Sequence, residues 1–275
     1  MPNSSNIDFN YLAEKAKTIR IHIINMLTMA GSGHPGGSLS AADILSALFF
    51  HELNHNPDKP EWADRDRFIL SKGHASPVLY ATLAECGYFP IKYLNTLRKI
   101  GSSLQGHPDK LSLPGVEMST GSLGQGLSLS TGLALGLLLN KKQSRVYTLL
   151  GDGEIQEGMV WEAAMAAAHY KVDNLVAILD RNTLQIDGPT EEVMALSSLK
   201  EKWQAFGWQV ITIDGHNLEQ ICFAFQEAKT IKGKPTMIIA NTIKGKGVSF
   251  MEGQLKYHGV APSEEEKVKA LEELA

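Results

Sequence analysis

The feature that most limits the fold of this chain is the alternation of short apolar runs with helical stretches. Each apolar run is followed at once by glycine or polar residues, as where Gly151-Asp152-Gly153 follows Val146–Leu150. The apolar runs cover residues 68–70, 146–150, 175–179, 210–213 and 236–240. Strands that alternate with helices pair in parallel and are covered by helices on both faces. We therefore expect a three-layer α/β/α fold with a mainly parallel central sheet.

Helices are expected at both ends of the chain and between the strands, because apolar residues recur there at three- and four-residue steps. Ser38 or Ser40 is expected to cap the second of these helices. The sequence shows no linker and no internal repeat, so we expect one domain over residues 1–275. The expected helices cover residues 1–30, Ser40 to about Phe50, 155–170, 217–231 and a short surface stretch after Pro262.

Composition excludes several classes of function. The 275 residues carry 26 basic and 30 acidic side chains, a formal charge of −4, so no global field recruits nucleic acid or a membrane. Hydrophobic residues make up 43% of the chain, which is enough to fill a core. The two cysteines make no disulfide framework, and neither a signal peptide nor an 18-residue apolar stretch is found. We expect a cytoplasmic protein.

The sharpest motif is Gly151-Asp152-Gly153-Glu154, with Asn182 thirty positions after Asp152. Asp152 and Asn182 both follow expected strands, and open α/β sheets bind ligands where their strands end. One carboxylate and one amide oxygen suit Mg²⁺ or Ca²⁺, and Mg²⁺ usually completes its six oxygens from phosphates and water. Gly153 lets the backbone approach an anion and opens a helix whose positive end favours phosphate. A metal and diphosphate site is therefore expected.

Other interpretations of this motif remain open. Gly-Asp-Gly is also a common turn, and Asn182 could simply cap a helix. The phosphate loop GxxxxGK[ST] is absent, which argues against a P-loop nucleotidase. The glycines of Gly121–Gly126 follow polar residues instead of an apolar strand, so they do not make a dinucleotide-binding fingerprint.

Five motifs, in this order along the chain, closely resemble those of transketolases, and more narrowly those of the N-terminal subunit of a split transketolase. The motifs are Gly33-His34-Pro35-Gly36, Ser71-Lys72-Gly73-His74, Gly106-His107-Pro108, Gly121-Ser122-Leu123-Gly124-Gln125-Gly126, and Gly151-Asp152-Gly153 with Asn182. The resemblance runs from about residue 10 to 262. It implies a thiamine diphosphate-binding (PP-type) domain of a pentose phosphate pathway enzyme. Such an enzyme transfers a two-carbon ketol unit from a ketose phosphate to an aldose phosphate.

The resemblance also implies roles for single residues. Asp152 and Asn182 would hold the metal through their side chains, and Leu184 through its carbonyl group. The implied contacts to thiamine diphosphate are His74, Gly121, Leu123, Gly153, Asn182 and Ile186. The histidines implied to line the substrate channel as catalytic groups are His34, His74, His107 and His258. Imidazoles suit this chemistry because sugar hydroxyls and carbonyls must exchange protons near neutral pH. Structural roles are expected for His22, His51, His55, His169 and His216.

Part of the active site is expected to come from another chain. In the resembled family, a glutamate from a second domain starts cofactor deprotonation, and no such domain is expected before this sequence ends at Ala275. The resemblance therefore implies a separate C-terminal subunit that supplies this glutamate, in an assembly of two copies of each chain. Glu157 is expected at a subunit interface, while Glu162 is left open.

Two alternative functions remain. The chain could serve another thiamine diphosphate enzyme, such as a deoxyxylulose-phosphate synthase or a ketoacid dehydrogenase. His34-Pro35-Gly36-Gly37 and Gly106-His107-Pro108 favour transketolase over these. It could also be a non-catalytic interaction module that keeps the fold, although the intact Asp152 and Asn182 argue against this.

Overall fold

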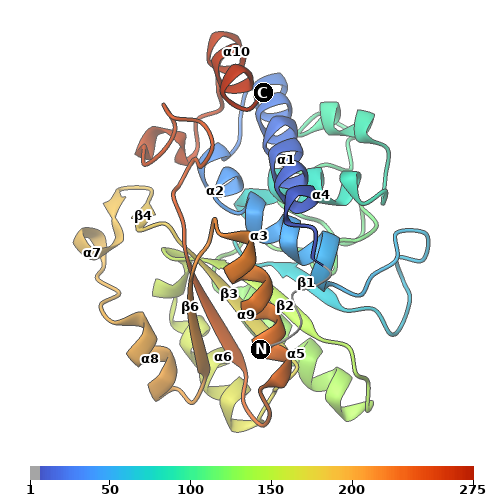
Figure 1. Ribbon diagram of the computed structural model, residues 1–275, viewed down its shortest axis with the longest axis vertical. Helices are drawn as coiled ribbons and strands as arrows, with labels where there is room; N and C mark the ends of the chain where they lie inside the picture. Colours follow the sequence, from blue (N-terminus) through green and yellow to red (C-terminus); the bar gives the residue numbers. More distant parts are fainter. Residues whose placement is uncertain (1–6) are drawn as a thin grey trace.

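A five-stranded parallel sheet lies between two layers of helices in the computed structural model, which describes residues 7–275 (Figure 1). The strands are β1 (Arg67–Leu70), β2 (Val146–Gly151), β3 (Leu175–Arg181), β6 (Gln209–Asp214) and β7 (Thr236–Asn241). They lie in the order β1-β2-β3-β7-β6, and every neighbouring pair is parallel. A small antiparallel hairpin of β4 (Leu184–Gln185) and β5 (Gly188–Pro189) follows β3. The expected strands and the three-layer fold are confirmed.

Helices precede, connect and follow the strands. The α-helices of the described residues are α1 (Phe9–Ala30), α2 (Pro35–Leu39), α3 (Ala42–Ala47), α4 (Ser76–Glu85), α5 (Gln125–Leu139), α6 (Gly158–His169), α7 (Thr190–Val193), α8 (Leu199–Ala205), α9 (Leu218–Thr230) and α10 (Glu264–Glu273). The helices expected at 217–231 and after Pro262 are confirmed as α9 and α10. Helix α1 begins after Asp8, whose carboxylate accepts the Tyr11 N–H. The first six positions of the expected N-terminal helix lie outside the described residues.

The expected second helix, Ser40 to about Phe50, is wrong in its start and its continuity. Helix α2 already begins at Pro35, because proline has a φ angle suited to the first helical position. The following α3 ends at Ala47 and continues as a π-helical turn, η1 (Leu48–Glu52). The expected caps are wrong too: the Ser38 hydroxyl donates to the His34 carbonyl, and the Ser40 hydroxyl donates to the Asp180 carboxylate.

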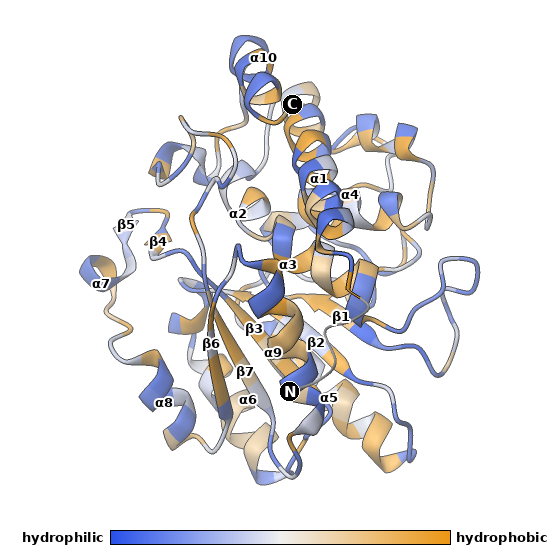
Figure 2. Ribbon diagram, viewed as in Figure 1, coloured by the Kyte–Doolittle hydropathy of each residue, from blue (hydrophilic) through white to orange (hydrophobic). Residues whose placement is uncertain are grey.

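Successive residues of each central strand point into two different apolar clusters. On β3, Val176 and Ile178 join the cluster that contains α1, α3, α4 and α9. Leu175, Ala177 and Leu179 join the cluster that contains α5, α6 and α8. The central strands are therefore apolar on both faces, and Figure 2 shows them as hydrophobic along their length. Burial on both faces is the reason why these strands appear as continuous apolar runs in the sequence.

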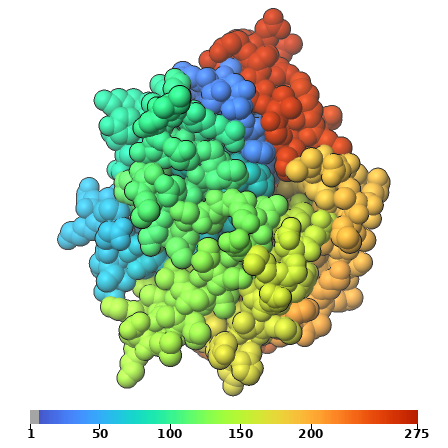
Figure 3. All heavy atoms as spheres, turned by 180° about the vertical axis from the view of Figure 1, so that it is seen from behind, coloured from blue at the N-terminus to red at the C-terminus, as the bar shows by residue number. Residues whose placement is uncertain are grey.

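The last helix of the described chain packs against the first one. Helix α10 packs against α1, and the view from behind shows these first and last segments side by side (Figure 3). A capping box of Ser263 and Glu266 begins α10, and Ala270 is its buried contact residue. No helix among residues 7–275 is long and apolar enough to cross a membrane.

A buried ion pair joins the segments that follow the strands. The Lys72 ammonium, after β1, pairs with the Asp180 carboxylate on β3, and both side chains are almost fully inaccessible to solvent. Asp180 also accepts the hydroxyl of Ser40 at 2.6 Å and that of Thr242, after β7. Lys72 donates in addition to the Gly37 carbonyl at 2.7 Å. Burial by itself raises the pKa of Asp180, but Lys72 and the two hydroxyls outweigh it and lower this pKa. Asp180 is therefore a carboxylate that connects three strand ends.

Replacing Asp180 by Asn should destabilise the fold strongly. The change leaves the Lys72 charge buried without its carboxylate, which typically costs about 3–5 kcal/mol. Adding Lys72→Met should recover part of this loss, because it removes the unpaired charge. The control is Asp64→Asn, which breaks an exposed ion pair with Lys142 and should cost about 1 kcal/mol or less. The free energy of unfolding, measured in urea, checks all three variants. Equal losses for Asp180→Asn and Asp64→Asn would contradict the buried role of Asp180.

Candidate active site

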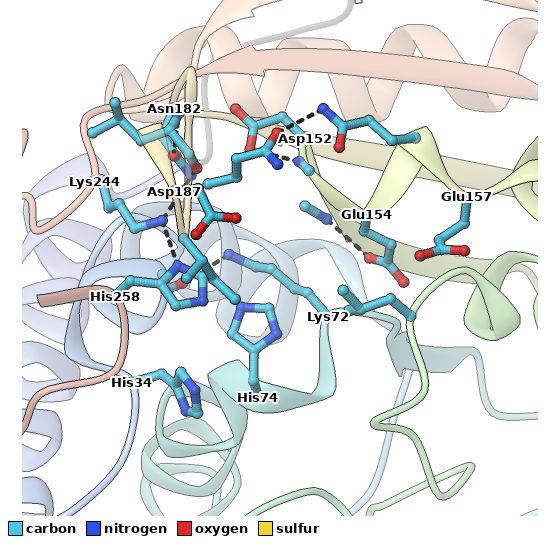
Figure 4. A pocket seen from close by; sticks show the side chains of 18 of the residues that line it. His34, Lys72, His74, Asp152, Glu154, Glu157, Asn182, Asp187, Lys244 and His258 are labelled. Carbon is cyan, nitrogen blue, oxygen red and sulfur yellow. Dashed lines mark hydrogen bonds between the residues drawn. The ribbon is translucent and has the colours of Figure 1, made fainter. Parts of the chain in front are cut away.

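A cavity of about 380 Å³ opens where β1, β2, β3 and β7 end (Figure 4). Its lining includes these residues singled out from the sequence: His34, His74, Gly121, Leu123, Asp152, Gly153, Asn182, Leu184, Ile186 and His258. His107 does not line the cavity, but its ring lies next to the backbone of Gly121, where a Cβ would be 3.1 Å from it. The fold thus brings nearly all the predicted site residues to one place.

Asp152 and Asn182 lie at the ends of two neighbouring strands, as expected. The Thr183 N–H donates to Asp152 Oδ2 at 2.5 Å, which connects the segment after β3 to the end of β2. Asn182 Oδ1 accepts the Leu184 N–H at 3.2 Å. Burial, and next to it the Asp180 carboxylate, raise the pKa of Asp152. The pocket therefore contains a buried carboxylate whose ionised form a cation would stabilise.

Two glycine turns meet at Glu154, a residue that the sequence analysis quoted without giving it a role. Its Oε1 atom accepts the Gly124 N–H at 2.9 Å, and its Oε2 atom accepts the Gly151 N–H at 3.0 Å. The Ser71 hydroxyl donates to Oε1 at 2.5 Å. Gly73 packs so closely on the neighbouring segment that a Cβ would be 2.8 Å from the Gly121 nitrogen. These contacts hold the glycine loops of the pocket at fixed positions.

Three of the four predicted catalytic histidines form a cluster. The ring centroids of His34 and His74 are 5.1 Å apart, and that of His258 lies 5.6 Å from His34 and 5.4 Å from His74. Burial, then Arg98, lower the pKa of His34 to about 4, while burial and Lys244 lower that of His258 to about 3. Burial and Lys72 also lower the pKa of His74 well below 6.5. The cluster is thus neutral at pH 7.

Lys244 is a pocket residue that the sequence analysis missed. Its ammonium group is buried, donates to the Leu184 carbonyl at 3.2 Å and contacts His258 Nδ1 at 2.9 Å. Because an ammonium group only donates, His258 Nδ1 accepts and the ring proton lies on Nε2. Burial lowers the pKa of Lys244 to about 8. No sequence signal marked this lysine, because a single lysine in a glycine-containing loop is usually an exposed surface residue.

The chemistry of these residues fits a divalent cation with a diphosphate group. Asp152, Asn182 and the Leu184 carbonyl supply three hard oxygen ligands of the kinds that Mg²⁺ and Ca²⁺ accept. The Leu184 carbonyl already faces a cation, the Lys244 ammonium. Among residues 7–275, no three His, Cys, Asp or Glu side chains lie close enough together to hold a metal ion. The expected metal ligands are of a different kind, because only Asp152 among them is one of these four residue types. His34 Nδ1 is buried without a hydrogen-bond partner in the described part of the chain.

The helix expected directly after Gly153 is wrong in detail. A single 3₁₀ turn, η4 (Glu154–Gln156), comes first, and α6 begins only at Gly158. The Gly153 N–H is occupied by the Asp152 carboxylate at 3.0 Å. Glu157 is therefore not inside the helix but is its N-cap residue, exposed at the edge of the pocket. Glu162 is exposed on α6. The interface role of Glu157 stays a prediction, and the role of Glu162 stays open.

Comparison with known proteins identifies the family. The model of the family described as transketolase, thiamine diphosphate binding domain, matches residues 12–274. The chain is 47% identical over 263 residues to a 6-deoxy-6-sulfo-D-fructose transketolase subunit of Clostridium sp. (strain MSTE9), covering 96% of each chain. It is 44% identical over 256 residues to an apulose-4-phosphate transketolase subunit of Phocaeicola vulgatus, covering 93% of this chain and 91% of that one.

Solved structures agree with this result. The crystal structure of transketolase from Campylobacter jejuni superposes with a TM-score of 0.92 at 38% identity, and the match covers 98% of this chain. It covers 43% of the Campylobacter chain, so the present chain spans about two fifths of that enzyme. Matches of this extent and identity mean that the chain belongs to the transketolase family, as its thiamine diphosphate-binding domain.

Proposed function

We propose that this chain is the diphosphate-binding subunit of a split transketolase that transfers a two-carbon ketol unit from a ketose phosphate to an aldose phosphate. The observation that carries the proposal is the meeting of Asp152, Asn182 and the Leu184 carbonyl with a histidine cluster in one cavity. We also propose that residues 1–275 form a single domain. Because the chain belongs to the transketolase family, we also propose that it uses magnesium or calcium, acts in the pentose phosphate pathway and is located in the cytoplasm.

In this function, the chain's own residues bind and orient the cofactor. Asp152, Asn182 and the Leu184 carbonyl would hold the metal ion, and the Gly153 backbone and His74 would meet the diphosphate. The buried Lys244 ammonium adds positive charge on the same side of the pocket. Gly121, Leu123 and Ile186 also line the cavity, and in this proposal they meet the rings of the cofactor. When bound, thiamine diphosphate supplies the carbanion chemistry needed to break the carbon–carbon bond beside a ketone.

The histidines would exchange protons with the substrate. His34, His74 and His258 are neutral at pH 7, so each has one ring nitrogen that donates and one that accepts. A neutral imidazole can therefore hydrogen-bond to sugar hydroxyl and carbonyl groups and exchange protons with them. His107, against the backbone of Gly121, would extend this row of imidazoles at the cavity margin.

A partner chain completes the proposed enzyme. Relatives that match this chain along nearly all of their length are themselves named transketolase subunits, which supports a split enzyme. We propose that a C-terminal subunit supplies the catalytic glutamate and the pocket for the aminopyrimidine ring, in a heterotetramer with two copies of each chain. The sugars in the relatives' names, a 6-sulfo-fructose and apulose 4-phosphate, belong to those proteins. They support an anionic sugar as the substrate class here.

Asp152→Ala should abolish metal-dependent cofactor binding. In the complex with the partner, affinity for thiamine diphosphate in Mg²⁺ should fall at least about a hundredfold, because even outer-shell changes can cost that much. The variant should still fold, since Arg181, which contacts Asp152, keeps its ion pair with Glu191. Calorimetric titration with and without Mg²⁺ measures the effect. The control is Asp173→Ala, whose carboxylate accepts the Gly233 N–H far from the pocket. Retained Mg²⁺-dependent affinity in Asp152→Ala would remove the metal assignment.

The purified chain alone should not turn over sugar phosphates. With thiamine diphosphate, Mg²⁺, xylulose 5-phosphate and ribose 5-phosphate, activity should appear only when the C-terminal subunit is added, because the catalytic glutamate comes from it. Pyruvate as donor should give no product, which separates transketolase from synthase and dehydrogenase chemistry. Turnover by the chain alone would refute the split-enzyme proposal. Cofactor binding without any turnover in the complex would favour a non-catalytic module.

A further inference from the structure

The segment that carries Lys244 has no regular secondary structure. It runs from the end of β7 to the 3₁₀ helix η5 (Leu255–His258) as a series of turns. Its position is set by contacts with other parts of the chain, such as the Gly245 N–H, which donates to the Gly36 carbonyl at 3.0 Å. The direction in which the Lys244 side chain points therefore depends on how the neighbouring backbone groups are held.

Side chains from two distant elements hold the residues on either side of Lys244. The Ile243 N–H donates to His216 Nε2 at 2.8 Å, and His216 lies in the turn between β6 and α9. The Lys246 carbonyl accepts from Arg20 Nε at 3.0 Å, and Arg20 lies on α1. The backbone is thus held just before Lys244 and two residues after it.

Both of these side chains bind the same carboxylate, Asp43 on α3. Arg20 donates to it through two nitrogens, at 3.0 Å and 2.6 Å. His216 Nδ1 lies 2.7 Å from Asp43 Oδ2. Because His216 Nε2 accepts the Ile243 N–H, the ring proton is on Nδ1, where it donates to Asp43. Asp43 therefore fixes both the orientation and the tautomer of His216.

Burial and close packing make this arrangement rigid. Asp43 is 7% exposed and Arg20 is 8% exposed. Burial by itself raises the pKa of Asp43, but the His216 hydrogen bond and the Arg20 charge outweigh it and lower this pKa, so the group is a carboxylate. Gly247 has a φ of +95°, and a Cβ there would lie 3.0 Å from Arg20 Cδ. The loop backbone therefore packs directly on the Arg20 side chain.

We infer that His216 is a positioning residue: oriented by Asp43 and together with Arg20, it holds the backbone around Lys244 so that the ammonium group of this lysine points into the cofactor cavity. The part of this inference that concerns cofactor binding rests on the proposed function. His216, expected from the sequence to be merely structural, then acts on the site without touching it.

Two substitutions of His216 separate its two hydrogen bonds. In His216→Gln, the side chain can place an acceptor near the position of Nε2, where it faces the Ile243 N–H. In His216→Asn, the shorter side chain can only take the place of Nδ1, which faces Asp43. The matched control is His22→Asn, because His22 Nε2 contacts the Glu85 carboxylate at 2.9 Å with similar burial, between α1 and α4 and away from the site. All variants are studied in the full chain, and kinetics in its complex with the C-terminal subunit.

Amide hydrogen exchange of peptides covering 243–253, without cofactor, tests the positioning of the loop. In His216→Asn the exchange of this segment should become about tenfold faster, as expected for the loss of one hydrogen bond. In His216→Gln it should return most of the way to the wild-type rate, because the acceptor for the Ile243 N–H is restored but the bond to Asp43 is not. In His22→Asn it should not change. Unchanged exchange in His216→Asn, or equal acceleration in the Asn and Gln variants, would overturn the inference. This result does not depend on whether the chain binds thiamine diphosphate.

Kinetics of the complex test the effect on the site. In His216→Asn the KM for thiamine diphosphate should rise about tenfold, with kcat at saturating cofactor within about twofold of wild type. In His216→Gln the KM should return most of the way to the wild-type value. A lower melting temperature with an unchanged KM would mean that His216 only stabilises the fold, and would overturn the link to Lys244. Absence of cofactor binding in the wild-type complex would refute the proposed function and leave the exchange result standing.

Discussion

The buried ion pair between Lys72 and Asp180 is the contact on which the pocket depends. A charge inside a protein is tolerated only when its partners satisfy it, and Asp180 is satisfied by the Lys72 ammonium and the Ser40 and Thr242 hydroxyls. These donors come from the segments after β1, before α3 and after β7. Satisfying one carboxylate therefore brings together the segments that carry Gly37, His74 and Lys244.

The sequence predicts the layers and the placement of Asp152 and Asn182 at neighbouring strand ends well, because both depend on local patterns. Strands buried on both faces are continuous apolar runs, and Asp152 and Asn182 follow two of these runs directly. The remaining parts of the site depend on contacts between distant residues. Lys72 and Asp180 are 108 residues apart, and Lys244 reaches the Leu184 carbonyl across 60 residues. No local pattern marks either pair, and the wrong cap expected at Ser40 has the same cause, since the Ser40 hydroxyl donates to the distant Asp180 carboxylate instead of capping a helix.

The site is organised in layers around neutral histidines. The innermost groups are the oxygens of Asp152, Asn182 and Leu184 and the imidazoles of the cluster. Glu154 and the Lys72–Asp180 pair hold the glycine loops and strand ends, and Asp43 with its two partners holds the Lys244 segment. Burial keeps the histidines uncharged, so the positive charge of the pocket is carried by lysine side chains, whose geometry depends on buried carboxylates. We propose that these layers hold the groups of this chain that bind an anion and a metal, while the partner supplies the catalytic glutamate.

A crystal structure of the chain with its C-terminal subunit, thiamine diphosphate and Mg²⁺ tests the central claim most directly. We expect the metal to be bound by Asp152, Asn182 and the Leu184 carbonyl, with the diphosphate beside Gly153 and His74. The ring end of the cofactor should face the partner subunit. A cofactor held at another place, or a metal that does not contact Asp152, would contradict the proposed site.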